Sequence, residues 1–147
     1  MWPLFHTTWA MNKLLLLVLV SLLLCQCKTV IISGPVPHPP LKHLAVVNND
    51  DVHMDDFQSF MVGQIRDMGI KTTVVQAPPG NADYLTYTAI WRWDFGMYLR
   101  RFRATLHRPQ SPPRSVVYEN GGLDFSKFGE GPDKIRTPMR QLLLGCH

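Results

Sequence analysis

Hydrophobic and polar residues alternate most strictly over residues 82–95, which read ADYLTYTAIWRWDF. Such alternation, rich in aromatic and β-branched residues, predicts a long strand with one buried and one exposed face. The alternation resumes over 98–106 after a turn near Gly96, so we expect a second strand that pairs with the first in a hairpin. One face of this hairpin carries large aromatic side chains, namely Tyr87, Trp91, Trp93, Tyr98 and Phe102. They could line a ligand or partner surface, but because they share one face we expect them in the core.

Shorter patterns predict the remaining strands. Residues 43–49 and 71–76 read as strands, and 115–119 as a short strand after a proline-rich break. With a helix after the first strand and another at the end, the order is β-α-β-β-β-β-α. This order indicates an α+β fold, a two-layer sandwich in which a mostly antiparallel sheet of about five strands carries two helices on one face. The other sheet face would stay partly open to solvent.

The first helix is predicted from apolar residues that recur at spacings of three and four. These are Phe57, Phe60, Met61, Ile65 and Met68. Asp55 with Gln58 forms a variant of the capping box at its start, and Gly69 follows its last apolar position.

The second helix is predicted from a similar apolar pattern near the C-terminus. Its apolar positions are Ile135, Met139, Leu142 and Leu143. It begins either near Asp133, with a kink at Pro138, or at Thr137 with Pro138 as its first helical residue. Gly145 ends it.

The N-terminus has the pattern of an export signal. Lys13 precedes an apolar run of eleven residues, Leu14–Leu24, in which only Ser21 is polar. A positive residue followed by a run of about 7–15 apolar residues is typical of a secretory signal, whereas a spanning helix needs about 20. We therefore expect residues 1–26 to be a signal peptide. We expect Met11 to be the true initiator and 1–10 to be a misassigned start.

Two cysteines, Cys25 and Cys27, follow the apolar run directly and resemble the acylated cysteine of bacterial lipoproteins. Cys27 is the preferred lipidation site, with Cys25 as the alternative, because Leu24 stands where the lipoprotein pattern has leucine. A plain secretory signal without a lipid is the other interpretation. By resemblance to known sorting rules, Lys28 after the cysteine favours the outer membrane, with the domain facing the periplasm.

Residues 28–40, KTVIISGPVPHPP, are rich in proline and glycine. Because proline disfavours helices and inner strands, we expect 27–40 to be a lipidated cysteine and an extended tether. Such a tether would hold the domain about 30 Å from the membrane. The folded domain would then span 41–147.

Several segments resemble a family of short, uncharacterised lipoproteins of proteobacteria. The resemblance lies in the cysteine-terminated signal and the segments ADYLTYTAIWRWDFGMYL, VVYENGG and KIRTPMRQLLLG. Family members pair an LTYTA…WD strand with a Gly-Gly loop and a C-terminal helix, and the match covers most of 41–145. It implies a lipid-anchored envelope protein and supplies no catalytic motif. The β-α-β opening is also similar, at the level of fold, to periplasmic domains of curli-secretion-type and transport-auxiliary lipoproteins.

Charge argues against nucleic-acid binding. The 147 residues contain 15 Lys and Arg against 11 Asp and Glu, a net charge of +4. Removal of 1–26 takes away Lys13 and no acid, which leaves a net charge of +3. Nucleic-acid binding usually needs a concentrated basic face.

Acidic and amide residues crowd the segment before the first helix. They are Asn49, Asp50, Asp51, His53, Asp55 and Asp56. Carboxylates with His53 could bind a metal ion, which would suit a small periplasmic hydrolase or metal-dependent enzyme. Helix capping explains the same acids, and the EF-hand spacing is absent from the sequence, so we expect no metal and no cofactor. Cys146 beside His147 lacks a third orienting residue, so we assign no catalytic residues.

The expected partner surface is the exposed face of the hairpin. Arg92, Arg101 and Arg103 should cluster there near Asp94. Such a face could meet an acidic envelope protein, anionic lipid headgroups or lipopolysaccharide. The sequence thus predicts a non-enzymatic periplasmic binding or assembly domain, anchored to the membrane by lipid.

Overall fold

The computed structural model describes residues 28–52, 54, 56–93, 96–121 and 131–145. Within them the chain forms six strands in one sheet, and two helices. In chain order these are β1 (Lys28–Ser33), β2 (His43–Val47), α2 (Phe57–Asp67), β3 (Lys71–Val75), β4 (Tyr84–Trp93), β5 (Met97–Arg108), β6 (Ser111–Asn120) and α3 (Gly131–Leu144).

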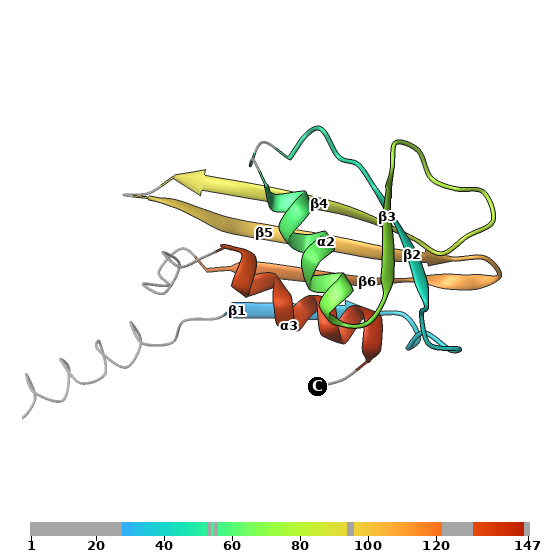
Figure 1. The fold of residues 1–147 in the computed structure, drawn as a ribbon. Coiled ribbons are helices and arrows are strands. Elements are labelled where there is room, and N and C mark those ends of the chain that lie inside the picture. The colour runs from blue at the N-terminus through green and yellow to red at the C-terminus, as the bar shows by residue number, and fades with distance from the viewer. Residues whose placement is uncertain (1–27, 53, 55, 94–95, 122–130, 146–147) are drawn as a thin grey trace, which may run out of the picture.

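The sheet is mixed, with strand order β1-β6-β5-β4-β2-β3 (Figure 1). Neighbouring strands are antiparallel from β1 through to β4, whereas β2 is parallel to both β3 and β4. The β2–β3 pair is parallel because α2 carries the chain back to the starting edge of the sheet, as a crossover connection must. The predicted α+β class is confirmed. The expectation of about five mostly antiparallel strands is wrong, since the sheet is mixed and has six.

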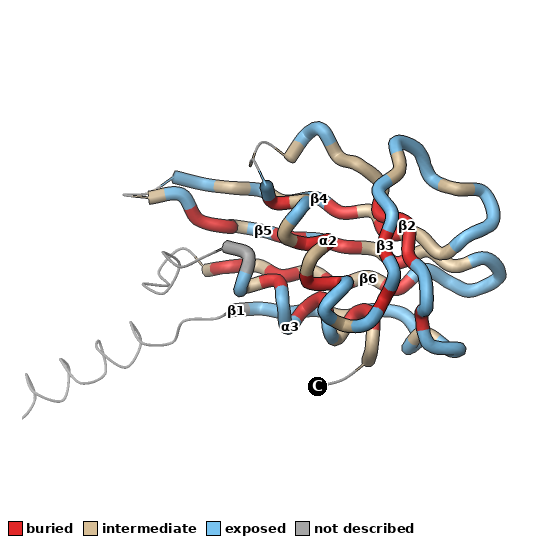
Figure 2. The backbone as a smooth tube through the Cα atoms, in the orientation of Figure 1, coloured by how far each residue is buried: buried red, intermediate tan, exposed pale blue. Residues whose placement is uncertain are grey.

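Both helices cover the same face of the sheet and contact each other (Figure 1). The core lies between the two layers, as the buried positions in Figure 2 show. Phe57, at the start of α2, lies at an aromatic junction in this core. Its ring centroid is 5.6 Å from that of Trp91 and 6.0 Å from that of Phe102, both in edge-on geometry. Edge-on aromatic pairs of this kind stabilise a core beyond their buried area.

The predicted hairpin forms from β4 and β5, but its buried face changes part-way along. Thr88 pairs with Arg103 and Ile90 with Arg101, whereas Trp91 pairs with Leu99. Arg100 is therefore the extra residue of a β-bulge. Beyond the bulge Leu99, fully buried in the core cluster, takes the inward position that strict alternation gave to Tyr98. Tyr98 is buried as predicted, at 7% exposed, but it lies on the other face of the sheet. The extra residue shifts the alternation by one, so residues 97–99 on the far side of the bulge point opposite to the directions that strict alternation predicts.

The segment expected to be a tether is part of the domain. Residues 28–33 form β1, which pairs with β6 from Lys28↔Asn120 to Ser33↔Ser115. The tether expectation is wrong there because the first proline is Pro35. The β-branched stretch before it is free to complete the sheet edge. Leu41 is buried in the core, so the folded unit extends back to residue 28.

The helix ends differ in detail from the predictions. Asp56, not Asp55, is the N-cap of α2; it has a left-handed backbone (φ 65°) and no side-chain capping bond. Asp55 itself lies outside the described residues. Since α3 begins at Gly131, Pro138 lies inside the helix, and the alternative that placed it first is wrong. Gly145, at φ 69°, follows the last residue of α3 as predicted.

Candidate functional site

The sheet face opposite the helices, here called the open face, carries the predicted arginines. Arg103 lies across from Thr88, and Arg101 lies across from Ile90. Arg92 is two residues beyond Ile90 on β4, so it projects to the same face. All three residues are exposed. The sequence therefore placed Arg92, Arg101 and Arg103 on one face correctly, and we call them the arginine row. Asp94, expected beside them, lies outside the described residues.

Arg101 and Arg103 of the arginine row have different neighbours. Arg101 forms an ion pair with Glu119 of β6, in which the two side chains are 51% and 42% exposed. Arg103 instead lies between Thr88 and Val117, its uncharged partners on the neighbouring strands. Exposed ion pairs contribute little stability, so Arg101 and Glu119 can exchange partners readily. A guanidinium with neutral neighbours suits bidentate recognition of a carboxylate or phosphate.

Hydrogen-bonded polar residues flank this row on the open face. The rings of Tyr84 and His107 are stacked, with centroids 4.5 Å apart and planes at 8°. His107 Nε2 is 3.1 Å from Thr86 Oγ1, and the Ser33 and Ser115 hydroxyls are 2.7 Å apart. These contacts join β4 to β5 and β1 to β6. Hydrogen-bonded polar side chains therefore cover part of the open face.

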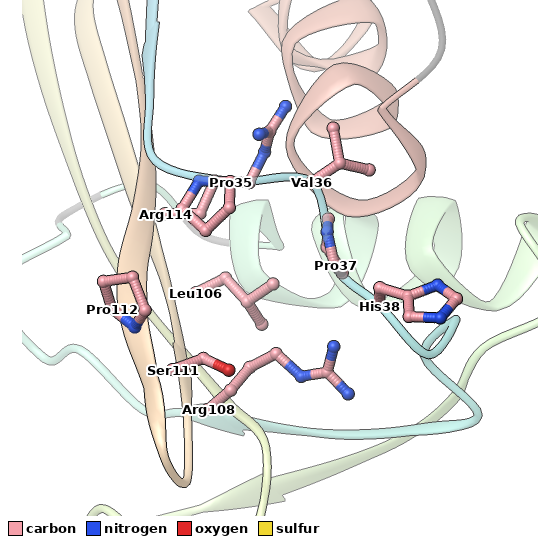
Figure 3. A pocket seen from close by; sticks show the side chains of 9 residues that line it. All are labelled: Pro35, Val36, Pro37, His38, Leu106, Arg108, Ser111, Pro112 and Arg114. Carbon is pink, nitrogen blue, oxygen red and sulfur yellow. The ribbon is translucent and has the colours of Figure 1, made fainter.

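A cavity of about 220 Å³ lies where the segment after β1 crosses the end of the β5–β6 hairpin (Figure 3). Two arginines lie beside it. Arg108 donates to the Asp83 carboxylate at 3.3 Å and to the Pro39 carbonyl at 3.0 Å. Arg114, only 8% exposed, donates to the carbonyl oxygens of Gly34 and Gln141. Because both guanidiniums already bind main-chain oxygens, we assign them a structural role.

The polar segment before α2 is organised by its own side chains. Asn49 donates to the Tyr87 carbonyl at 2.6 Å, and its Oδ1 accepts the Asp51 backbone N–H at 3.0 Å. Burial raises the pKa of the Tyr87 phenol. The Asp50 carboxylate acts in the same direction, and a backbone hydrogen bond from Asn49 opposes them. Asn49 and Asp50 therefore lie beside a buried phenol.

The metal-site hypothesis depends on residues that the structure does not describe. His53 and Asp55 lie outside the described residues, while Asp51 and Asp56 are exposed. Among the residues that are described, no group of three or more His, Cys, Asp or Glu side chains could hold a metal ion. The lipidation candidates Cys25 and Cys27 are also outside this part of the chain, as are Cys146 and His147. No helix in the described part is long and apolar enough to cross a membrane.

The far end of the β4–β5 hairpin is a feature that sequence reasoning missed. Trp93 and Met97 pair across the two strands and are 71% and 52% exposed, although Trp93 was expected in the core. The lengths of β4 and α2 explain why Trp93 is exposed. The ten residues of β4 span about 33 Å at 3.3 Å per residue, whereas the eleven of α2 span about 16 Å. A strand this long outruns the helices that cover it.

Comparisons with known proteins identify a shared fold. No family model matches the chain, and no curated protein matches it. Among solved structures, a variant of PelC from Paraburkholderia phytofirmans, described as a dodecamer, is similar with a TM-score of 0.55 and 16% identity. That match covers 80% of this chain and 98% of the PelC chain. Another PelC dodecamer from the same organism has a TM-score of 0.54 and 15% identity, covering 80% and 99%. At this identity the likeness shows the fold alone.

Proposed function

We propose that this protein is a lipid-anchored, non-enzymatic domain of the bacterial cell envelope that binds a negatively charged envelope component through its open face. The arginine row is the observation that carries the proposal. It presents three exposed guanidiniums on one sheet face, and Arg103 has uncharged cross-strand neighbours. Surfaces of this kind recognise carboxylates and phosphates and steer acidic partners toward them.

The anchor proposal is supported by the order of segments at the N-terminus. The apolar run Leu14–Leu24 ends near Cys27, and β1 begins at the next residue, Lys28. An acylated Cys27 would therefore join the lipid directly to the sheet. Metabolic labelling with a clickable fatty acid tests this. We expect the label in wild type and in Cys25→Ser, and its loss in Cys27→Ser; an unlabelled wild type contradicts the anchor.

Charge reversal tests the open face. In Arg92→Glu with Arg103→Glu, cross-linking of the anchored protein to envelope components should fall well below the wild-type level. The matched control is Arg136→Glu with Arg140→Glu, which makes the same charge change at exposed positions of α3. Equal cross-linking in wild type and in both double variants would contradict the open face as the binding surface.

We also propose that the domain assembles with copies of itself. The observation in favour is the fold shared with PelC, whose solved structures are dodecamers. Native mass spectrometry of the protein released from membranes in detergent should show a discrete oligomer. A monomer at every concentration tested would contradict self-assembly.

The alternative of a small hydrolase or metal-dependent enzyme rests on His53 and its acidic neighbours. Elemental analysis of the purified protein discriminates between the two functions. Bound metal that is lost in His53→Ala would favour the enzyme, whereas a metal-free protein that retains its envelope cross-links would favour the binding domain.

A further inference from the structure

The end of the β4–β5 hairpin exposes large apolar side chains that fold stability does not explain. Trp93 is 71% exposed, Met97 52% and Ile90 46%. Trp93 and Met97 are cross-strand partners, so their side chains lie next to each other. Figure 2 shows this end of β4 as an exposed stretch beyond the helices. We call Ile90, Trp93 and Met97 the hairpin end.

The hairpin end lies at the same end of the sheet as the start of β1 (Figure 1). The strand register shows how far Trp93 extends past Lys28. Lys28 pairs with Asn120, while the preceding residue of β6, Glu119, pairs with Arg101, which in turn pairs with Ile90. Trp93 is three residues further along β4. Because Lys28 lies one residue nearer this end than Ile90, Trp93 lies two residues, or roughly 7 Å at 3.3 Å per residue, beyond the level at which the chain enters the sheet.

No spacer separates Cys27 from the sheet, because β1 begins at Lys28. Cys27 is covalently joined to Lys28, so their Cα atoms are about 3.8 Å apart. A lipid on Cys27 would hold this end of the sheet at the bilayer surface. A hairpin that projects further in the same direction must then meet the same bilayer.

We infer that the hairpin end is a membrane-contacting element, which seats Trp93 and Met97 in the interface of the leaflet that holds the lipid anchor. This inference rests on the proposed lipid anchor at Cys27. Trp is enriched at membrane interfaces because its ring is apolar while its N–H still bonds to water or headgroups. Met97 adds a flexible apolar side chain beside it.

Charge at this end of the sheet fits a phospholipid surface. Arg92 is exposed next to Trp93, Arg100 is half-exposed at the bulge, and Arg101 is exposed on the same hairpin. Arginine guanidiniums bind headgroup phosphates in bidentate fashion, and basic residues near a bilayer are attracted to anionic lipids. The occupant we assign to the hairpin end is therefore an anionic phospholipid headgroup layer.

Two points of attachment would fix the orientation of the domain. A lipid alone lets a domain rotate, whereas a lipid together with an inserted hairpin directs the long strands toward the membrane. The open face would then be presented sideways along the membrane surface. Arg103, the member of the arginine row furthest from the hairpin end, would be accessible to components in the same leaflet.

Tryptophan fluorescence of the mature protein in vesicles tests the inference. Of the four tryptophans, two lie within residues 1–26, so the processed chain keeps only Trp91 and Trp93. The protein, with Cys27 acylation verified by intact mass, is reconstituted into vesicles of phosphatidylethanolamine and brominated phosphatidylglycerol. We expect bromine to quench the wild type, and the quenching to be lost in Trp93→Phe, whose remaining Trp91 packs against Phe57.

Iodide in the aqueous phase separates the alternatives. Acylated protein whose Trp93 is unaffected by bromolipid but quenched by iodide overturns the inference and leaves the lipid anchor intact. A Trp93 shielded from both quenchers also overturns it, because a protein then covers the hairpin end. An unacylated Cys27 refutes the anchor and the inference together, and the mass spectrum distinguishes that failure from the others.

A second pair of variants tests the hairpin end with Trp93 left in place. Met97→Ser, beside Trp93, should weaken the bromolipid quenching of Trp93. Val74→Ser is the matched control, since Val74 is 47% exposed on β3 and remote from the hairpin end. Equal quenching in the two variants counts against insertion of the hairpin end.

Discussion

Arg114 donates a hydrogen bond to the main-chain carbonyl of Gln141, 3.1 Å away, so a buried cation lies at the C-terminal end of α3. That end of a helix carries partial negative charge and unpaired carbonyls, which a guanidinium satisfies. The same side chain donates to the Gly34 carbonyl at 2.6 Å. One residue of β6 thus ties the last helix to the segment that follows β1.

Replacement of Arg114 by leucine should destabilise the domain by about 2 kcal/mol, because the Gly34 carbonyl loses the donor that Arg114 supplies. The loss at Gln141 is smaller, since its carbonyl also accepts the Gly145 N–H at 3.1 Å. Urea unfolding measures the free energy. Arg103→Leu, an exposed position on the open face, is the control and should change stability by less than about 0.5 kcal/mol.

Gly34 tests whether the N-terminal segment belongs to the folded unit. Its φ of +93° suits glycine, and a Cβ there would lie 2.6 Å from the Pro113 carbonyl oxygen and 2.8 Å from the Arg114 Cα. Gly34→Ala should therefore destabilise the domain by about 2 kcal/mol or more through backbone strain and displacement of β6.

The matched control for Gly34→Ala is Gly80→Ala, where a Cβ would meet nothing within 4 Å. We expect this control to change the free energy of unfolding by less than about 0.5 kcal/mol. Equal stability of the two variants would mean that residues 28–40 are a spacer after all.

Tyr87 predicts a pH dependence at the alkaline end. Burial raises the pKa of its phenol above the ordinary value of 10.0, so the folded state favours the neutral form. The stability from this group is fully present below pH 10 and is lost as the pH rises through the folded-state pKa, because the unfolded chain ionises first. Urea midpoints of wild type should fall more steeply above about pH 10 than those of Tyr87→Phe. Parallel pH profiles would contradict the raised pKa.

Much of the fold follows from local pattern, and the misses have local causes. Alternation located β4 and β5 and placed the arginine row on one face. It succeeded there because the β4–β5 register has no irregularity between Arg101 and Leu106. It failed at Tyr98 and Leu99 because a one-residue bulge at Arg100 is invisible to a period-two pattern.

Proline misled the prediction in two neighbouring strands, β1 and β6. Four prolines after Gly34 hid the strand that ends at Ser33. In β6, Pro112 and Pro113 hid the strand's first half, although they are tolerated because β1 reaches only as far as Ser115. The pairing of β1 with β6 ends at Ser115, so neither proline has to donate a hydrogen bond to β1.

We expect Trp93 and Met97 of the hairpin end to contribute little to stability and to act in membrane contact. Trp93→Ser with Met97→Ser should lower the free energy of unfolding by less than about 1 kcal/mol, the worth of one cross-strand pair. Trp91→Ser, two residues away, should cost about 3 kcal/mol because Trp91 packs against Phe57 in the core. Urea unfolding of both variants measures the difference. A large loss in the double variant would mean that Trp93 and Met97 help to hold the fold. A small loss, combined with bromolipid quenching of Trp93 in the wild type and weakened quenching in Met97→Ser, would assign the two side chains to the membrane.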